Sequence, residues 1–165
     1  MEVQPDFKDL FEFFNAHKVD YMIVGGYALA FHGAPRFTAD IDIFVRPEPD
    51  NAQRVMAALD QFGFGSVGLS PVDFERPEMV VQLGVSPVRI DITTTISGVS
   101  WEEAASGRET GEYGGVPVFF IGREQFVINK RTTGRKHLAA VSLCRLRVAH
   151  AALVESREHV GRDRL

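Results

Sequence analysis

Cysteine is almost absent from this sequence, because Cys144 is the only one among 165 residues. A single cysteine excludes an internal disulfide, and it suits a reducing, cytoplasmic setting. Long apolar runs are also missing, since none approaches the roughly 20 residues needed to cross a bilayer. The first residues lack the basic start and apolar centre of a signal peptide. We therefore expect a cytoplasmic protein without a membrane partner.

Basic residues are scarce in most of the chain and concentrated in one block. Residues 1–122 hold 8 Lys and Arg against 18 Asp and Glu, whereas residues 123–147 hold 7 against 1. This basic block (residues 123–147) could meet an anionic ligand such as a triphosphate or RNA. Charge alone, however, favours the simpler interpretation, which is the solvated face of a helix.

The hydrophobic pattern indicates one mixed α/β domain. Apolar runs and alternation predict strands over residues 21–24, 40–46, 79–85, 88–96 and 116–121, the last of them closing the sheet. Helical spacing predicts helices capped by Asp6, by Asp50 or Asn51 and by Ser100, a short helix over 27–32, and two C-terminal helices separated by a break at 132–134. The second of these covers residues 138–153, and residues 64–77 are expected to form a loop. We expect an α/β core over 1–122, with a helical segment over 123–165 packed on it.

Three aspartates lie within stretches that otherwise look like buried strands. Asp40 and Asp42 alternate with Ile41 and Ile43, and Asp91 stands between Ile90 and Ile92. Alternation places the aspartates on one face and the isoleucines on the other, so neighbouring strands would bring three carboxylates together. Such a cluster is costly unless a cation intervenes, and carboxylate oxygens suit Mg²⁺. An isolated Asp-x-Asp, however, is also tolerated at a solvated strand end.

A glycine pair precedes the first aspartates. Gly25 and Gly26 follow a predicted strand and precede a predicted short helix, a junction where a phosphate can approach the backbone closely. Arg36 and Thr38 add a cation and a hydroxyl in the loop that enters the next strand, and Arg36 could clamp a phosphate. The simpler interpretations are a tight turn for the glycines and a salt bridge for Arg36.

The combination of these motifs resembles the minimal nucleotidyltransferases of the polymerase-beta superfamily. The resemblance spans about residues 19–95 and is greatest to the bacterial abortive-infection and toxin–antitoxin group. It rests on Val24-Gly25-Gly26-Tyr27-Ala28-Leu29, on His32-Gly33-Ala34-Pro35-Arg36-Phe37-Thr38-Ala39-Asp40-Ile41-Asp42, and on the later Asp91. It implies a nucleotidyltransferase-like twisted mixed β-sheet flanked by helices, with C-terminal helices.

The resemblance also implies a reaction and roles for individual residues. A nucleoside monophosphate would pass from a nucleoside triphosphate such as ATP to a hydroxyl acceptor, with two Mg²⁺ ions, or Mn²⁺, as cofactors. Metal binding and catalysis would be carried out by Asp40, Asp42 and Asp91. The triphosphate would be held by Gly25 and Gly26, and Lys130 would contact a phosphate. The loop residues described above add Arg36 and Thr38 to the expected nucleotide-binding set. Asp91 would also receive the proton of the acceptor hydroxyl.

The sequence departs from the family pattern at three positions. Gly26 stands where many active members have serine, and His137 and Ala140 stand where related chains often have aspartate. A second hypothesis is therefore a catalytically degenerate module that binds nucleotides or RNA. A third is the toxin of a toxin–antitoxin pair acting on tRNA, which would add an antitoxin as partner. The acceptor, whether small molecule, RNA or protein, is not encoded in any motif, because fold does not select it.

Overall fold

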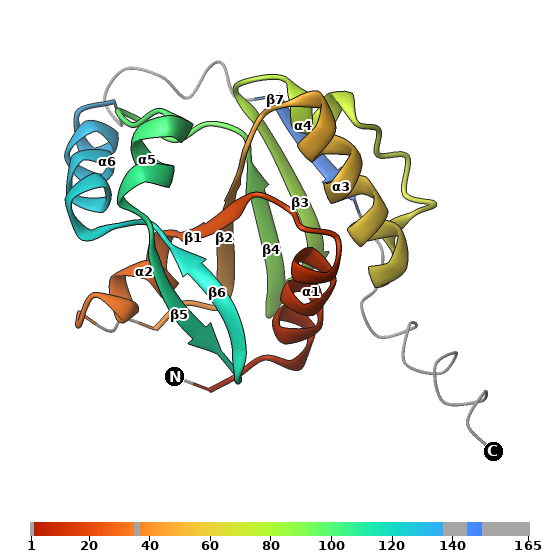
Figure 1. Ribbon diagram of the computed structural model, residues 1–165, viewed down its shortest axis with the longest axis horizontal. Helices are drawn as coiled ribbons and strands as arrows, with labels where there is room; N and C mark the ends of the chain where they lie inside the picture. The colour runs from red at the N-terminus through yellow and green to blue at the C-terminus, as the bar shows by residue number, and fades with distance from the viewer. Residues whose placement is uncertain (1, 35–36, 137–144, 150–165) are drawn as a thin grey trace.

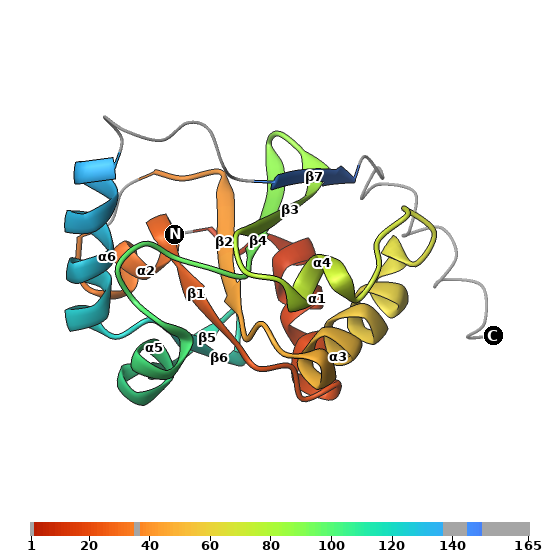
Figure 2. The same cartoon turned by 90° about the horizontal axis from the view of Figure 1, so that it is seen from above.

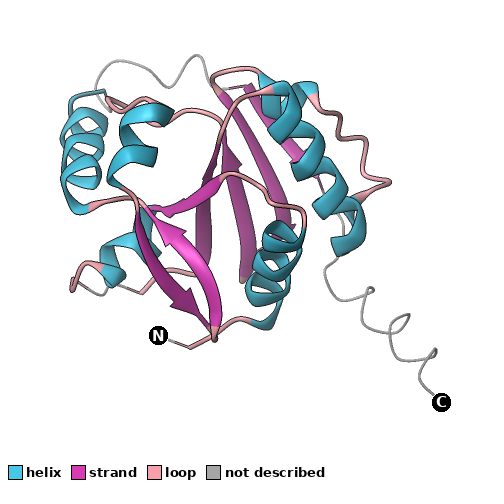
Figure 3. Cartoon of the chain, viewed as in Figure 1, coloured by secondary structure: helices cyan, strands magenta, loops and turns pink. Residues whose placement is uncertain are grey.

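The computed structural model describes residues 2–34, 37–136 and 145–149, whose helices and strands are shown in Figures 1 and 3. The strands are β1 (Tyr21–Val24), β2 (Asp40–Val45), β3 (Met79–Val85), β4 (Val88–Thr93), β5 (Glu109–Tyr113), β6 (Val116–Phe120) and β7 (Arg145–Ala149). The helices are α1 (Pro5–Ala16), α2 (Gly25–Phe31), α3 (Pro49–Leu59), α4 (Val72–Glu75), α5 (Trp101–Gly107) and α6 (Arg123–Lys136), with a π-helical turn η1 (Asp60–Phe64). Among these residues, no helix is long and apolar enough to span a bilayer.

The described strands form one mixed sheet in the order β5-β6-β1-β2-β4-β3-β7. Parallel pairs join β1 to β6, β2 to β4 and β3 to β7, and antiparallel pairs join β1 to β2, β3 to β4 and β5 to β6. Figure 2 shows α1, α3 and α4 on one side of this sheet and α2, α5 and α6 on the other. The prediction of a mixed α/β fold with flanking helices is confirmed.

Alternation along the two central strands separates a core face from a polar face. Ile41 and Ile43 of β2 and Ile90 and Ile92 of β4 are completely buried. The aspartates between them are only partly buried and belong to the opposite face. The core face is covered by the amphipathic helix α1, whose apolar positions at i, i+3, i+4 and i+7 are all buried: Phe7, Leu10, Phe11 and Phe14. Burial of one face therefore fixes which side chains the other face presents.

The C-terminal region differs from the sequence-based prediction. Helix α6 runs through residues 132–134 to Lys136, so the predicted break there is wrong. The predicted helix over 138–153 is also wrong where it is described, because Arg145–Ala149 forms strand β7 in parallel pairing with β3. The strand that ends at Phe120 is therefore not the last one. His137, Ala140 and the remaining parts of that segment lie outside the described residues, and the division at residue 122 stays a prediction.

Proline sets the start of two helices that the sequence interpretation placed later. Helix α1 begins at Pro5 and α3 at Pro49, so the caps are Gln4 and Glu48 rather than Asp6 and Asp50 or Asn51. Proline suits the first helical turn because its missing N–H would have no intrahelical partner there. The predicted cap of α5 is confirmed, since Ser100 and Glu103 form a reciprocal capping box.

Two short elements were not predicted. Strand β5 lies at the edge of the sheet and is mostly exposed. Its sequence, Glu-Thr-Gly-Glu-Tyr, is polar and therefore lacks the apolar alternation that predicts a strand. Helix α4 has four residues and lies within the segment expected to be a loop. Both are too short or too polar for periodicity to detect.

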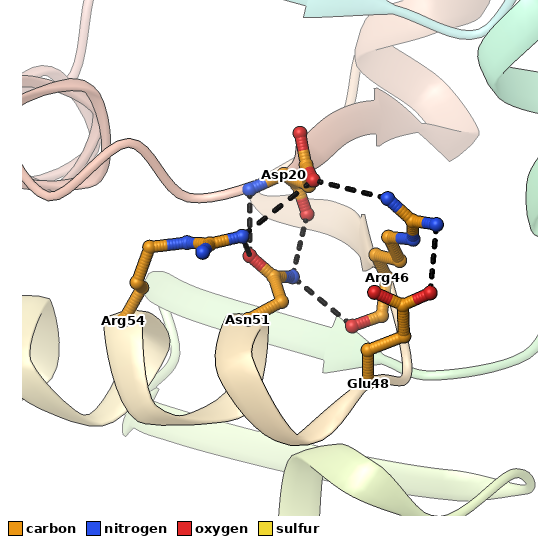
Figure 4. Close-up of polar contacts among 5 residues, drawn as sticks. All are labelled: Asp20, Arg46, Glu48, Asn51 and Arg54. Atoms are coloured by element: carbon orange, nitrogen blue, oxygen red, sulfur yellow. Dashed lines mark hydrogen bonds and ion pairs between the residues drawn. The ribbon is translucent and has the colours of Figure 1, made fainter.

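A polar cluster ties the start of β1 to the end of β2 and to α3, as Figure 4 shows. We call it the far-end clasp, and its members are Asp20, Arg46, Glu48, Asn51 and Arg54. Asn51 is fully buried; its side-chain oxygen accepts from the backbone N–H of Asp20 at 2.8 Å. Its amide nitrogen donates to the backbone oxygens of Asp20 and Arg46, each at 3.0 Å.

The charged members of the clasp add weaker contacts at its rim. The Asp20 carboxylate lies 3.6 Å from Arg46 and 3.7 Å from Arg54, and Arg46 also pairs with Glu48 at 2.7 Å. These side chains are about one-third exposed or more, so each pair contributes little. Because β1 and β2 are antiparallel, the clasp lies at the opposite end of this pair from Val24 and the aspartates.

Replacing Asn51 tests how much the clasp stabilises the fold. Asn51→Ala removes three hydrogen bonds to the backbone and leaves the N–H of Asp20 without its partner, so we expect the free energy of unfolding to fall by about 3 kcal/mol. Urea unfolding measures this change. Arg54→Gln, which removes a partly exposed ion pair and one long hydrogen bond to Asn51, should lower the same quantity by less than about 1 kcal/mol. Equal losses for both variants would contradict the assigned role of Asn51.

Candidate functional site

The register of β2 and β4 brings the predicted carboxylates to one face of the sheet. The strands run parallel, with Asp42 directly opposite Asp91 and Asp40 directly opposite Arg89. On its other side, Asp42 pairs with Val24, the last residue of β1. Three strands that are distant in sequence therefore meet at the point where β1 turns into α2.

The turn at that point requires glycine at position 25. Gly25 has a φ of +66°, which L side chains rarely adopt. A Cβ atom at this position would also stand 2.8 Å from Cγ of Asp42 and overlap its carboxylate. The backbone of Gly25 thus packs directly against the carboxylate of Asp42, and no other residue leaves room for both.

Position 26 carries glycine rather than serine, and the side chain of Thr38 lies beside it. A Cβ atom on Gly26 would lie 2.9 Å from Cγ2 and 3.3 Å from Oγ1 of Thr38. The threonine side chain therefore fills the space that a side chain at position 26 would need. Its hydroxyl donates to the backbone oxygen of Asp40 at 3.1 Å, which ties the entering loop to the start of β2.

A cleft of about 300 Å³ opens over the aspartate face, between the sheet and α6. It is lined by the β1–α2 junction, three strands, the segment that follows β4, and one side of α6: Val24, Gly25, Asp42, Val80, Asp91, Thr93, Ile96, Ser97, Asn129, Lys130 and Thr133. Two carboxylates, one ammonium group and several hydroxyl and amide groups thus face a common space.

Helix α6 is held over the cleft by the segment that follows β4. The amide of Asn129 donates to the backbone oxygen of Ser97 at 3.0 Å. Gly98, with a φ of +78°, allows Thr132 to pack closely, because a Cβ there would lie 2.9 Å from Cβ of Thr132. These contacts place Lys130 across the cleft from the aspartates, where its charge lowers the pKa of Asp42.

An arginine lies among the aspartates on the same face. The terminal nitrogen of Arg89 is 2.7 Å from Oδ2 of Asp40, and its Nε is 3.2 Å from Oδ1 of Asp91. Arg89 therefore partly neutralises two of the three carboxylates. Asp42 is not in ion-pair contact with Arg89 among the described residues, although the same charge lowers its pKa.

The two carboxylates in the cleft resist ionisation. Burial, and then the charge of Asp91, raise the pKa of Asp42 to about 6. Burial also raises the pKa of Asp91, against the opposing effect of Arg89. Like charges in a half-buried site are unfavourable, so a bound cation would stabilise the ionised forms of both.

The residues present fit a magnesium ion at Asp42 and Asp91. Both offer carboxylate oxygens to the cleft, and Mg²⁺ is commonly bound by one or two carboxylates together with substrate phosphates. Within the described part of the chain, no group of three or more His, Cys, Asp and Glu side chains is arranged to hold a metal ion. Asp40, drawn toward Arg89, does not line the cleft.

The predicted site residues are brought together in part. Gly25, Asp42, Asp91 and Lys130 line one cleft, whereas Asp40, Gly26 and Thr38 lie beside it without lining it. Arg36 lies outside the described residues. The sequence interpretation did not assign a role to Arg89, which pairs with two of the aspartates, or to several cleft residues, above all Asn129 and Thr133. The signal for the latter was their helical spacing around Lys130, and for Arg89 its position two residues before Asp91 in a strand.

Comparison with known proteins identifies a similar fold. No family model and no curated protein sequence matches the chain. A proposed nucleotidyltransferase from Thermotoga maritima, known from its crystal structure, superposes with a TM-score of 0.61 at 16% sequence identity. The match covers 84% of this chain and 91% of that protein. At this identity the likeness establishes the fold, which is nucleotidyltransferase-like.

The charge of Asp42 should cost stability when no metal is bound. The pKa of Asp42 is about 6 in the folded state, above the ordinary value of 3.8. Between these two pH values the folded state therefore keeps a proton that the unfolded state has released. The free energy of unfolding therefore falls as pH rises from about 4 to above 6, by about 2–3 kcal/mol from this group. Asp42→Asn should remove this fall and make the protein more stable at pH 8.

Urea unfolding in a chelating buffer between pH 4.5 and pH 8 measures this effect. The matched control is Glu2→Gln, the same carboxylate-to-amide change at an exposed residue outside the helices and strands. We expect the control to keep the pH profile of the wild-type protein. An Asp42→Asn protein with an unchanged profile, or with lower stability at pH 8, would contradict this account of the site.

Proposed function

We propose that this protein is a magnesium-dependent nucleotidyltransferase that moves a nucleoside monophosphate from a nucleoside triphosphate to a hydroxyl acceptor. One observation carries the proposal: Asp42 and Asp91 meet across paired strands, beside the glycine turn at Gly25 and opposite Lys130. Carboxylates, an open backbone turn and a cation around one cleft are what a metal-bound triphosphate requires. The similarity of fold to the Thermotoga maritima protein supports it.

The proposed roles follow from the position of each group. Asp42 and Asp91 would hold magnesium, which when bound supplies positive charge to the phosphates and to the attacking oxygen, and Asp40 is the further ligand proposed from the sequence. The backbone of Gly25 lines the cleft beside the Asp42 carboxylate, where it would face the phosphates, and Lys130 would neutralise phosphate charge from the opposite wall. Asp91 would accept the proton of the acceptor hydroxyl, because its raised pKa favours proton uptake.

Thr38 and Gly26 form one unit in this proposal. Thr38 fills the space beside Gly26, so its hydroxyl would serve where related chains use a serine at the glycine turn. Arg36, two residues earlier, is proposed as a further phosphate ligand. The acceptor class, whether small molecule, RNA or protein, and a partnership with an antitoxin remain to be identified by experiment, because no described residue selects among them.

The alternative function is nucleotide or RNA binding without turnover. The observation that favours it is the engagement of Asp40 by Arg89, which removes one carboxylate from the cleft. Calorimetry with each nucleoside triphosphate and Mg²⁺, followed by an assay for pyrophosphate, separates the two functions. Binding without pyrophosphate in the presence of RNA, aminoglycosides or the protein itself would favour the binding module.

Removal of either cleft carboxylate should abolish transfer without unfolding the protein. Because metal ions contribute several kcal/mol to such reactions, Asp42→Asn and Asp91→Asn should each lower the rate of pyrophosphate release by about a thousandfold or more. Circular dichroism verifies the fold. Asp50→Asn, at an exposed position of α3 that does not line the cleft, is the control and should keep the wild-type rate. Undiminished release in either cleft variant would refute the proposed chemistry.

Lys130 should affect nucleotide binding more than the fold. A charge-assisted contact contributes about 1.5–3 kcal/mol, so Lys130→Gln should raise the KM for the triphosphate by at least about tenfold. Steady-state kinetics at two salt concentrations measures this, and the wild-type advantage should shrink at high salt. Lys8→Gln is the matched control, since Lys8 pairs with Glu12 on the other side of the sheet. An unchanged KM would remove Lys130 from the site.

A further inference from the structure

The aspartate face carries its own cation in the form of Arg89. Strand pairing sets Arg89 directly opposite Asp40, and strand alternation sets it on the same face as Asp91. Its guanidinium therefore reaches two carboxylates at once, at 2.7 Å and 3.2 Å. Each of these carboxylates uses one oxygen toward Arg89, and the Asp91 carboxylate also has a side-chain hydrogen bond with Gln82.

The contact between Arg89 and Asp91 is electrostatic rather than a well-formed hydrogen bond. Nε of Arg89 and Oδ1 of Asp91 are both buried and neither makes a hydrogen bond, although the two atoms form an ion pair. The side chain of Asp91 is only 15% exposed, so water does little to replace the missing bond.

The charges of the cluster determine how many metal ions it can hold. Asp40, Asp42 and Asp91 carry three negative charges when ionised, and Arg89 reduces this to two. Two negative charges match one divalent ion. Lys130, across the cleft, adds positive potential and makes no ion pair with the aspartates within the described residues. A second divalent ion would therefore meet no uncompensated carboxylate.

We propose that Arg89 is a built-in counter-cation that takes the place of one metal ion, so that the nucleotide-free protein binds a single divalent ion at Asp42 and Asp91. A second ion would enter only with the negative charges of a triphosphate. This inference rests on the proposed function, because it concerns the metal of the same site. It makes Arg89 a positioning residue that acts through the carboxylates.

The number of ions bound by the wild-type protein is the first test. We expect calorimetric titration of the full chain with Mn²⁺ alone to give one ion per chain. Electron paramagnetic resonance of the free Mn²⁺ provides an independent count. Two ions of similar affinity in the absence of nucleotide would overturn the proposal. This test uses the wild-type protein alone, so its result stands even if a variant fails to fold.

Replacement of Arg89 is the second test. Arg89→Gln leaves three carboxylates uncompensated, so we expect Mn²⁺ to bind at least about tenfold more tightly and to raise the melting temperature more than in the wild-type protein. Arg89→Lys keeps the charge and should stay within about threefold of the wild-type affinity. Unchanged or weaker binding by Arg89→Gln would overturn the proposal.

Arg54→Gln provides the matched control. Arg54 pairs with the carboxylate of Asp20 in the far-end clasp, at the other end of β1 and β2, and its replacement changes the net charge by the same amount. We expect this variant to bind Mn²⁺ like the wild-type protein, since solvent and salt screen a charge at that distance. A tightening equal to that of Arg89→Gln would show a general charge effect and overturn the local role.

The pyrophosphate assay distinguishes failure of this inference from failure of the proposed function. Pyrophosphate release by a protein whose Mn²⁺ binding does not depend on Arg89 would retain the nucleotidyltransferase and reject the counter-cation. Binding of one Mn²⁺ ion, tightened by Arg89→Gln, without pyrophosphate release would retain the counter-cation and reject the transfer reaction. Absence of Mn²⁺ binding by every variant would reject both.

Discussion

The pairing of Asp42 with Asp91 across β2 and β4 is the constraint on which this structure depends. Parallel pairing with a buried isoleucine on either side of each aspartate fixes the backbone positions of the two residues side by side on one face of the sheet. The hydrophobic core on the other face of the sheet therefore keeps the two aspartates adjacent in spite of their mutual repulsion. The site does not create this arrangement locally; it follows from the register of two strands that join residues about fifty positions apart.

Much of this arrangement was predictable because isoleucine and aspartate alternate strictly along the two strands. The isoleucine–aspartate pattern assigns faces directly, and glycine at position 25 marks the turn that a ligand can approach. The helical spacing of Phe7, Leu10, Phe11 and Phe14 likewise identified α1 and its buried side. In each case a local period and the physical requirement to bury apolar groups point to the same answer, so no knowledge of distant contacts was needed.

Other features depend on partners that a sequence does not reveal. Residues 145–149 fit a helical period, yet they form an edge strand because β3 offers a row of unpaired backbone groups. Asn51 was interpreted as a helix cap, whereas its amide is used by backbone groups of Asp20 and Arg46. Arg89 becomes important only through register with Asp40. Long-range pairing, rather than local preference, decides all three.

The close fit of Thr38 against Gly26 shows that a hydroxyl group and a tight turn need not come from adjacent residues. The turn supplies a compact backbone, and a neighbouring segment supplies the side chain that fills the volume beside it. The two positions must then change together, since a larger residue at one demands a smaller residue at the other. A search for a glycine–serine pair will therefore pass over a chain in which the side chain beside the turn comes from another segment.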